Sequence, residues 1–185
     1  MKEIEAKILE ISKKKVEETL SHIGAAKIFD GVIETIFFDF KDSAIVRASN
    51  VLRLRKEQDR IELTFKKVSF TKEAKTAEEF TVEVSSLEAM RKILENLGLK
   101  ETESMQKHRT SYSLEGARFD IDHYFGAYGY IPDFMEIEAA SIDQIHRYAG
   151  LLGFKAEDCL PWSTNDLVRH YSTKKQEPEK NTQRK

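Results

Sequence analysis

The chain has 185 residues, 40% of them hydrophobic, which is enough for one domain with a packed core. Its 30 basic and 32 acidic residues leave a net charge of -2, and this balance argues against nucleic-acid binding by bulk charge, because such domains are strongly basic. The single cysteine, Cys159, excludes an intramolecular disulfide and a cysteine-based metal site, and it fits a reducing cytoplasm. The first residues lack the apolar stretch of a signal peptide, and no run approaches the roughly 20 apolar residues of a membrane span. We therefore expect a cytoplasmic protein that binds neither nucleic acid nor membrane.

Hydrophobic periodicity alternates along the chain between the two-residue repeat of strands and the 3.6-residue repeat of helices. The two-residue repeat predicts strands over residues 3–11, 33–40, 51–55, 61–67, 77–84, 106–114, 117–124 and 134–139. The helical repeat predicts helices over residues 12–24, 86–97, 141–152 and 164–171. Ser12 and Ser86 can cap the first two helices, and Gly24 and Gly98 can end them.

The connections between these elements favour an antiparallel arrangement. Residues 51–67 and 106–124 each predict a hairpin, while residues 68–76 and 125–132 are expected to be loops, the first of them mobile. We predict an α+β fold, in which a closed eight-stranded antiparallel β-barrel carries the helices on its outside. No linker divides residues 1–172, and residues 173–185, rich in lysine, glutamine and glutamate, are expected to form a disordered tail.

Charged side chains occupy one face of nearly every predicted strand. Because successive side chains of a strand point to opposite faces, the apolar face must carry the helices, and the charged face is then expected to point into the barrel. The polar and charged residues of that face are Glu3, Glu5, Lys7, Arg53, Arg55, Glu62, Thr64, Lys66, Glu79, Thr81, Glu83, Lys107, Arg109, Arg118, Asp120, Asp122, Glu136 and Glu138.

Like charges recur two residues apart on this face, for example in Arg53 and Arg55 and in Glu136 and Glu138. Such pairs repel each other unless a ligand or counter-ion compensates them. Basic pairs suit phosphate oxygens, and carboxylate pairs suit Mg²⁺ or Mn²⁺, which prefer oxygen ligands. Two interpretations stay open: the charges form the solvated side of an ordinary half-buried sheet, or they enclose a polyphosphate bridged by metal.

An ordered series of short motifs resembles the CYTH superfamily, whose members are also called triphosphate tunnel metalloenzymes. The series begins with the ExExK motif Glu3-Ile4-Glu5-Ala6-Lys7, and residues 163–167 are similar to the closing helix of the family. The motifs between them are Phe37-Phe38-Asp39, Leu52-Arg53-Leu54-Arg55, Leu63-Thr64-Phe65-Lys66, Lys107-His108-Arg109, Asp120-Ile121-Asp122 and Glu136-Ile137-Glu138. The resemblance extends from residue 2 to about residue 171.

The resemblance implies an eight-stranded tunnel that takes a small-molecule triphosphate together with Mg²⁺ or Mn²⁺, and it leaves a homodimer possible. The residues it assigns to phosphate binding are Lys7, Arg53, Arg55, Lys66, Lys107 and Arg109. The residues it assigns to metal are Glu3, Glu5, Glu136 and Glu138, with Asp122 as a candidate for a second metal. Catalytic roles, at a second metal or on the attacking water, are expected for Glu79 and Glu83, with Lys66.

Three functions follow from this resemblance, because the family includes class IV adenylate cyclases, thiamine triphosphatases and inorganic triphosphatases. A metal-dependent triphosphatase is favoured. An adenylate cyclase would need a pocket for adenine, which the aromatic residues Tyr124, Phe125, Tyr128 and Tyr130 could provide. A non-catalytic polyphosphate-binding module comes third, since the complete carboxylate set favours metal chemistry. Phe37, where the family has tyrosine, and Ala77, where it often has arginine, bear on the identity of the substrate.

Overall fold

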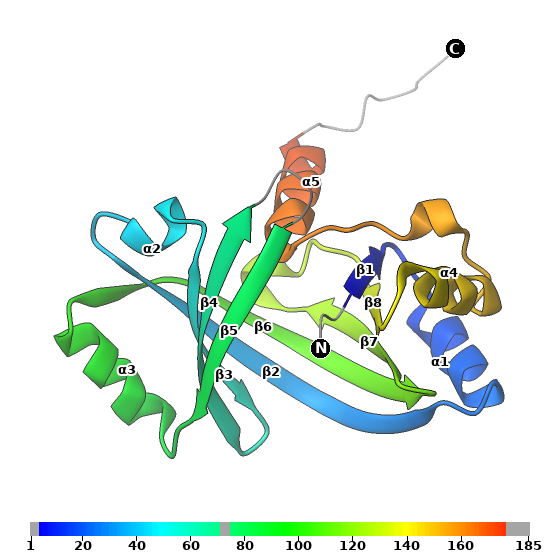
Figure 1. Ribbon diagram of the computed structural model, residues 1–185, viewed down its shortest axis with the longest axis horizontal. Coiled ribbons are helices and arrows are strands. Elements are labelled where there is room, and N and C mark those ends of the chain that lie inside the picture. The colour runs from blue at the N-terminus through cyan, green and yellow to red at the C-terminus, as the bar shows by residue number, and fades with distance from the viewer. Residues whose placement is uncertain (1–3, 71–74, 177–185) are drawn as a thin grey trace, which may run out of the picture. The chain divides into compact units, whose positions relative to one another are not determined.

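The computed structural model describes residues 4–70 and 75–176 of the chain (Figure 1). Its strands are β1 (Ile4–Ile8), β2 (Ala26–Phe40), β3 (Val51–Glu57), β4 (Arg60–Phe70), β5 (Lys75–Glu83), β6 (Leu99–Leu114), β7 (Ala117–Tyr124) and β8 (Phe134–Ala139). Its helices are α1 (Lys13–His22), α2 (Ala44–Arg47), α3 (Leu87–Asn96), α4 (Ile142–Leu151) and α5 (Thr164–Gln176), with the short 3-10 helices η1 (Gly126–Tyr128) and η2 (Ala156–Asp158). None of the helices in the described ranges is both long and apolar enough to cross a membrane.

The strands form one sheet with the hydrogen-bonded order β1-β8-β7-β6-β2-β3-β4-β5. Antiparallel pairing joins β1 to β8, β8 to β7, β2 to β3, β3 to β4 and β4 to β5. The prediction of an eight-stranded antiparallel sheet with helices is confirmed. Closure of the sheet into a barrel is not, because the order of the described strands is open, from β1 to β5.

The chain consists of two compact units. Unit 1 combines Met1–Asp30 with His108–Lys185, and unit 2 is Gly31–Lys107.

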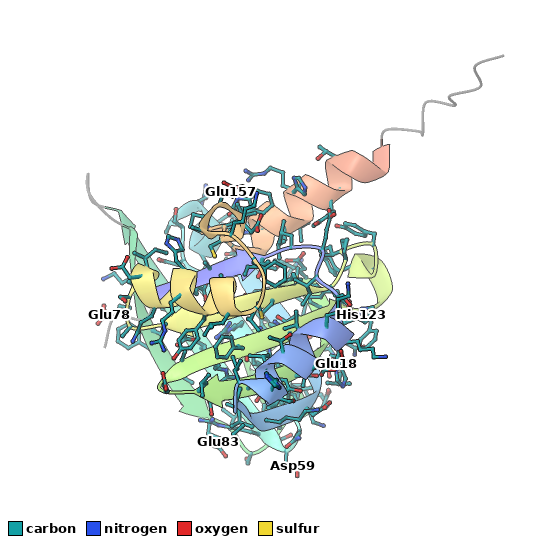
Figure 2. All side chains as sticks on the ribbon, turned by 90° about the vertical axis from the view of Figure 1, so that its right-hand side faces the viewer. Glu18, Asp59, Glu78, Glu83, His123 and Glu157 are labelled. Atoms are coloured by element: carbon teal, nitrogen blue, oxygen red, sulfur yellow. The ribbon has the colours of Figure 1, made fainter. Side chains whose placement is uncertain are left out.

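Unit 1 buries one face of its strands under α1 and α4. Figures 1 and 2 show both helices on the same side of β7 and β8. Val16 and Leu20 of α1 and Ile145 and Tyr148 of α4 are buried in this core. The strand residues they meet are Ala6, Ile8, Tyr112, Ala117, Phe119, Ile121, Met135, Ile137 and Ala139. The helices therefore cover the apolar face, and the charged residues that alternate with it lie on the other face.

Unit 2 repeats this arrangement around α3. The helix contributes Leu94, which is buried, and the partly buried Leu87 and Met90. The strand residues packed with them are Ile36, Phe38, Leu52, Leu54, Ile61, Leu63 and Phe65. Ser86 caps α3 by accepting a hydrogen bond from the backbone N–H of Ala89, as the sequence predicts.

Several strands are longer than the hydrophobic pattern predicts. β2 begins at Ala26 instead of residue 33, and β6 begins at Leu99 instead of residue 106. The predicted loop over residues 68–76 is largely strand, since backbone pairing between β4 and β5 continues to Phe70 and Lys75, and only residues 71–74 lie outside the description. Hydrogen bonds between strand backbones form whether or not the side chains are buried. Such extensions therefore show no hydrophobic repeat in the sequence. α5 extends to Gln176, and the predicted tail beyond it lies outside the described residues.

Asp39 shows how one of the motif residues acts within the fold. Its carboxylate is buried and accepts hydrogen bonds from the backbone N–H groups of Phe40, Ile45 and Val46, at 2.7 to 2.9 Å. Burial opposes the charge, but these three hydrogen bonds outweigh it and lower the pKa of Asp39 below its ordinary value. The residue therefore holds the start of α2 against the end of β2.

Replacement of Asp39 by alanine is expected to cost about 1–2 kcal/mol of unfolding free energy at neutral pH, the magnitude of a lost cap. Because the folded-state pKa is depressed, the contribution of Asp39 is present above its unfolded pKa and is lost as the pH falls through the folded value. Urea unfolding at pH about 7 and about 3 should show a difference from wild type that shrinks in acid. Asp42→Ala is the matched control, since Asp42 is 62% exposed, pairs with the exposed Arg47 and should change stability little at either pH.

Candidate functional site

In unit 1 the face opposite the helices carries a row of charged side chains across three strands. The strand register places Lys7 of β1 opposite Glu136 of β8, and Glu136 opposite Asp120 of β7. The ammonium of Lys7 lies 2.7 Å from a carboxylate oxygen of Glu136, and its side chain is only 2% exposed. A lysine buried to this extent needs a partner, and the row supplies one of opposite charge.

Arg109 of β6 is the centre of this charged cluster. Its Nε and one terminal nitrogen donate to the two carboxylate oxygens of Asp122, at 2.7 and 2.6 Å. The guanidinium also donates to Asp120 and to Glu136, at 2.5 and 2.7 Å. Burial of the guanidinium opposes its charge, but the carboxylates, Asp122 first among them, outweigh burial and raise the pKa of Arg109 well above its ordinary value. The guanidinium of Arg109 is thus permanently charged and held in a fixed orientation by three carboxylates.

The backbone of Lys7 is held on both sides. β8 pairs with one edge of β1, and on the other edge Lys7 and Leu160 exchange two backbone hydrogen bonds of 2.8 Å. Lys7 is therefore fixed by its backbone as well as by its ammonium. The pairing of Leu160 with Lys7 could not be predicted, because Leu160 lies in a segment without the two-residue hydrophobic repeat of a strand.

Two carboxylates face each other in the neighbouring row of unit 1. Glu5 lies directly opposite Glu138, and Glu138 lies directly opposite Arg118. Like charges across a strand pair are unfavourable unless compensated, and carboxylate oxygens are the ligands that Mg²⁺ and Mn²⁺ prefer. The side chain of Glu5 is 60% exposed, so it is accessible to an ion from solvent. The donor set therefore fits a divalent cation, although no group of three or more metal-ligating side chains is assembled among the described residues, and Glu3 lies outside them.

In unit 2 the charged face forms a second grid across β2, β3, β4 and β5. Its middle row contains, in order, Phe37, Arg53, Thr64 and Thr81. The row on one side contains Thr35, Arg55, Glu62 and Glu83, and the row on the other contains Val51, Lys66 and Glu79. The predicted phosphate-binding and catalytic residues of β3, β4 and β5 therefore do lie on one face.

Lys66 and Arg53 share one carboxylate in this grid. Glu79 lies 2.7 Å from the ammonium of Lys66 and 3.9 Å from a terminal nitrogen of Arg53. The Nε of Arg53 is buried and has no hydrogen-bond acceptor among the described residues. A buried donor without an acceptor is costly, and this one is available to an anionic ligand on the charged face.

The remaining predicted residues of unit 2 differ in their surroundings. Glu83 is 67% exposed and forms an ion pair with Arg60, which also pairs with Glu62. Lys107 is 9% exposed, and a lysine that is buried to this extent ordinarily has a partner of opposite charge. Glu83 thus lies at the solvent end of the face, whereas Lys107 lies within the protein.

The aromatic residues at the end of β7 and after it pack on one another. Tyr124 is 3% exposed and lies against Phe134 and Tyr128, with ring centroids 5.9 and 6.1 Å apart. Tyr128 in turn meets Tyr130 at 6.4 Å, and the hydroxyl of Tyr130 hydrogen-bonds to Ser172 at 2.9 Å. These rings form a packed cluster tied to α5.

Tyr124, the last residue of the predicted strand over residues 117–124, lies on the charged face but is not among the charged-face residues predicted from the sequence. Burial, followed by the charges of Asp122 and Glu136, raises its pKa well above the ordinary value, and its hydroxyl hydrogen-bonds to Thr164 of α5. The spacing from Asp122 to Tyr124 is two residues along β7, which could have placed the ring on the charged face.

Comparison with known proteins identifies the family. The CYTH domain family model matches residues 1–147. The chain belongs to the CYTH family. A Methanocaldococcus jannaschii relative named "Putative adenylate cyclase" is 32% identical over 143 residues, covering 77% of this chain and 79% of the relative.

Two solved structures show the same fold as this CYTH chain. A Pyrococcus horikoshii protein has a TM-score of 0.72 at 23% identity, with 90% of this chain and 99% of that chain covered. A Hippeastrum protein, described as a "putative adenylyl cyclase" with a dominant triphosphatase activity, has a TM-score of 0.65 at 14% identity, with 91% and 96% covered. CYTH proteins similar to this chain are thus named for cyclase and for triphosphatase activities.

Proposed function

We propose that the chain is a metal-dependent hydrolase of a triphosphate compound, either inorganic triphosphate or an organic triphosphate. The observation that carries the proposal is the Nε of Arg53, a buried donor without an acceptor among the described residues, on a face that also carries Arg55 and Lys66. Guanidinium and ammonium groups on one face suit the several oxygens of a triphosphate.

The phosphate-binding role is proposed for Lys7, Arg53, Arg55, Lys66, Lys107 and Arg109. Three of these groups are already held by carboxylates at hydrogen-bonding distance. Glu136 holds Lys7, Glu79 holds Lys66 and Asp122 holds Arg109. Preorganised charge of this kind stabilises the negative charge that develops on transferred phosphoryl oxygens. Asp122 is fully buried and both of its oxygens accept from Arg109, whereas Glu136 is 17% exposed. We therefore propose that Asp122 positions that guanidinium instead of binding a second metal.

Glu5, Glu136 and Glu138, with Glu3, are proposed to hold Mg²⁺ or Mn²⁺. The ion would supply charge neutralisation at the phosphate oxygens and a lowered pKa for a bound water. Glu79 and Glu83 are proposed to orient the attacking water, with Glu79 also keeping Lys66 in place. We further propose that the sheet closes into the eight-stranded tunnel that the family resemblance implies, in a cytoplasmic protein.

Adenylate cyclase activity is the second candidate, favoured by the name of the 32% identical relative. The aromatic cluster weighs against it, because Tyr124, Tyr128 and Tyr130 are engaged with one another and with α5. Phe125 is 39% exposed, and it meets the ring of His123, labelled in Figure 2, edge-on at 5.1 Å. A base would have to displace one of these contacts in order to stack there.

The deciding experiment measures phosphate release and cyclic AMP in parallel. Inorganic triphosphate, thiamine triphosphate and ATP are each supplied with Mg²⁺ or Mn²⁺. We expect phosphate release that requires metal and no cyclic AMP. Cyclic AMP with pyrophosphate from ATP would replace the hydrolase proposal with the cyclase. Tight binding of triphosphate without any turnover would indicate a binding module.

A further inference from the structure

Two threonines lie between the charged side chains of the charged face of unit 2. Thr64 of β4 and Thr81 of β5 are directly opposite each other, and their hydroxyl oxygens are 3.0 Å apart. Thr64 is 2% exposed, whereas Thr81 is open to solvent. Each hydroxyl has one proton, so a mutual hydrogen bond uses one proton and leaves the other for a further acceptor.

The difference in burial decides which hydroxyl donates outward. For the buried Thr64, the oxygen of Thr81 is the hydrogen-bond partner that the structure describes. Either oxygen can be the donor in this pair, but a buried hydroxyl proton without an acceptor is unfavourable, and this favours donation from Thr64 to Thr81. The proton of Thr81 is then directed away from Thr64, toward the open part of the face.

The row that contains Thr81 also contains one cation suited to phosphate, Arg53. Thr81 lies between Glu79 and Glu83 on the same face of β5, and Thr64 separates it from Arg53 in the same row. The Nε of Arg53 is the buried donor that lacks an acceptor among the described residues. One row therefore presents a charged donor and a hydroxyl donor.

We infer that Thr81 donates a hydrogen bond to a phosphate oxygen of the substrate, and that Thr64 is a positioning residue that fixes the direction of this bond. The inference rests on the proposed function, since it names two further residues of the same triphosphate site. The competing explanation is a cross-strand threonine pair that stabilises the sheet and touches no ligand.

Thr81→Val and Thr81→Ser separate these explanations. Valine keeps the branched shape that suits an exposed strand position and removes the hydroxyl, while serine retains the hydroxyl. With inorganic triphosphate as the probe, Thr81→Val should raise KM about ten-fold, because hydrogen bonds to charged groups are strong, and Thr81→Ser should stay near wild type. Thr64→Val should raise KM less, since Thr81 keeps its proton and loses only its orientation.

Thr102→Val is the matched control for this series. Thr102 is an exposed threonine of β6 in the same unit, on the strand face opposite to Lys107, and it donates to the carbonyl of Phe37. Its replacement should leave KM and kcat unchanged. Thermal unfolding of every variant shows whether the fold is retained.

The outcomes distinguish this inference from the proposed function. If wild type hydrolyses triphosphate and Thr81→Val has the wild-type KM, the inference is wrong and the proposed function stands. If Thr81→Val and Thr81→Ser lose affinity alike together with a lower melting temperature, the pair is structural and the inference is again wrong. Absence of both turnover and calorimetric triphosphate binding in wild type would overturn the proposed function itself.

Discussion

Replacement of Arg109 by methionine is expected to lower the unfolding free energy by about 3–5 kcal/mol, the cost of removing one partner from a buried ion pair. The variant leaves Asp120, Asp122 and Glu136 without the guanidinium that now donates to all three. Asp122 is fully buried, so water cannot replace the lost partner at its carboxylate. For a chain of this size the melting temperature should fall by roughly 6 to 20 °C.

A second substitution identifies the cause of this loss. Asp122→Asn removes one of the uncompensated charges, so the deficit of Arg109→Met should be smaller in the Asp122→Asn background. Arg118→Met is the matched control, because Arg118 is 40% exposed and bonds Asp120 from the solvent side. It should cost less than about 1 kcal/mol. A deficit in Arg109→Met that is equal in both backgrounds would point to lost packing and contradict the electrostatic account.

Arg55→Ala and Glu5→Gln are expected to abolish triphosphate turnover while leaving the far-UV circular dichroism spectrum unchanged. Arg55 belongs to the face that carries Arg53 and Lys66, and loss of one such donor to a developing oxyanion costs about 100-fold or more in turnover. Glu5 faces Glu138 and is 60% exposed, so its amide would remove a metal ligand without leaving a buried charge unpaired.

Matched variants off the charged face test the specificity of these effects. Arg47→Ala removes an arginine of unit 2 whose side chain is 65% exposed and pairs with Asp42. Glu18→Gln removes a carboxylate of α1, labelled in Figure 2, whose side chain is 64% exposed. Both should retain full turnover. The activity that Glu5→Gln loses should be partly restored by a raised Mn²⁺ concentration. Full activity in both Arg55→Ala and Glu5→Gln would refute the site assignment.

Alternation along the strands predicted which face of each strand carries the charges. The charged face holds Lys7, Arg109 and Asp120, and the intervening Ala6, Ile8 and Phe119 pack under helices. The prediction succeeds because a strand has only two faces, so a helix that needs an apolar surface determines where the charges go.

The partners within the charged face could not be predicted from the pattern. Asp122 was assigned to metal, yet its two oxygens accept from Arg109, because the register of two strands brings these side chains together. The role of Asp39 also depends on a chain reversal that returns Ile45 and Val46 to its carboxylate. Periodicity describes one strand at a time and contains no information on register or on turns.

The paired backbone hydrogen bonds between Lys7 and Leu160 determine which residues a shortened chain must retain. A terminal strand ordinarily frays, and its unpaired edge can recruit a strand from another molecule. Here Leu160, which lies beyond the residues 1–147 that the family model matches, forms both backbone hydrogen bonds with Lys7 on that edge. The segment that contains Leu160 therefore contributes to the stability of β1, and a chain shortened to residues 1–147 would leave the backbone of Lys7 unpaired on that edge.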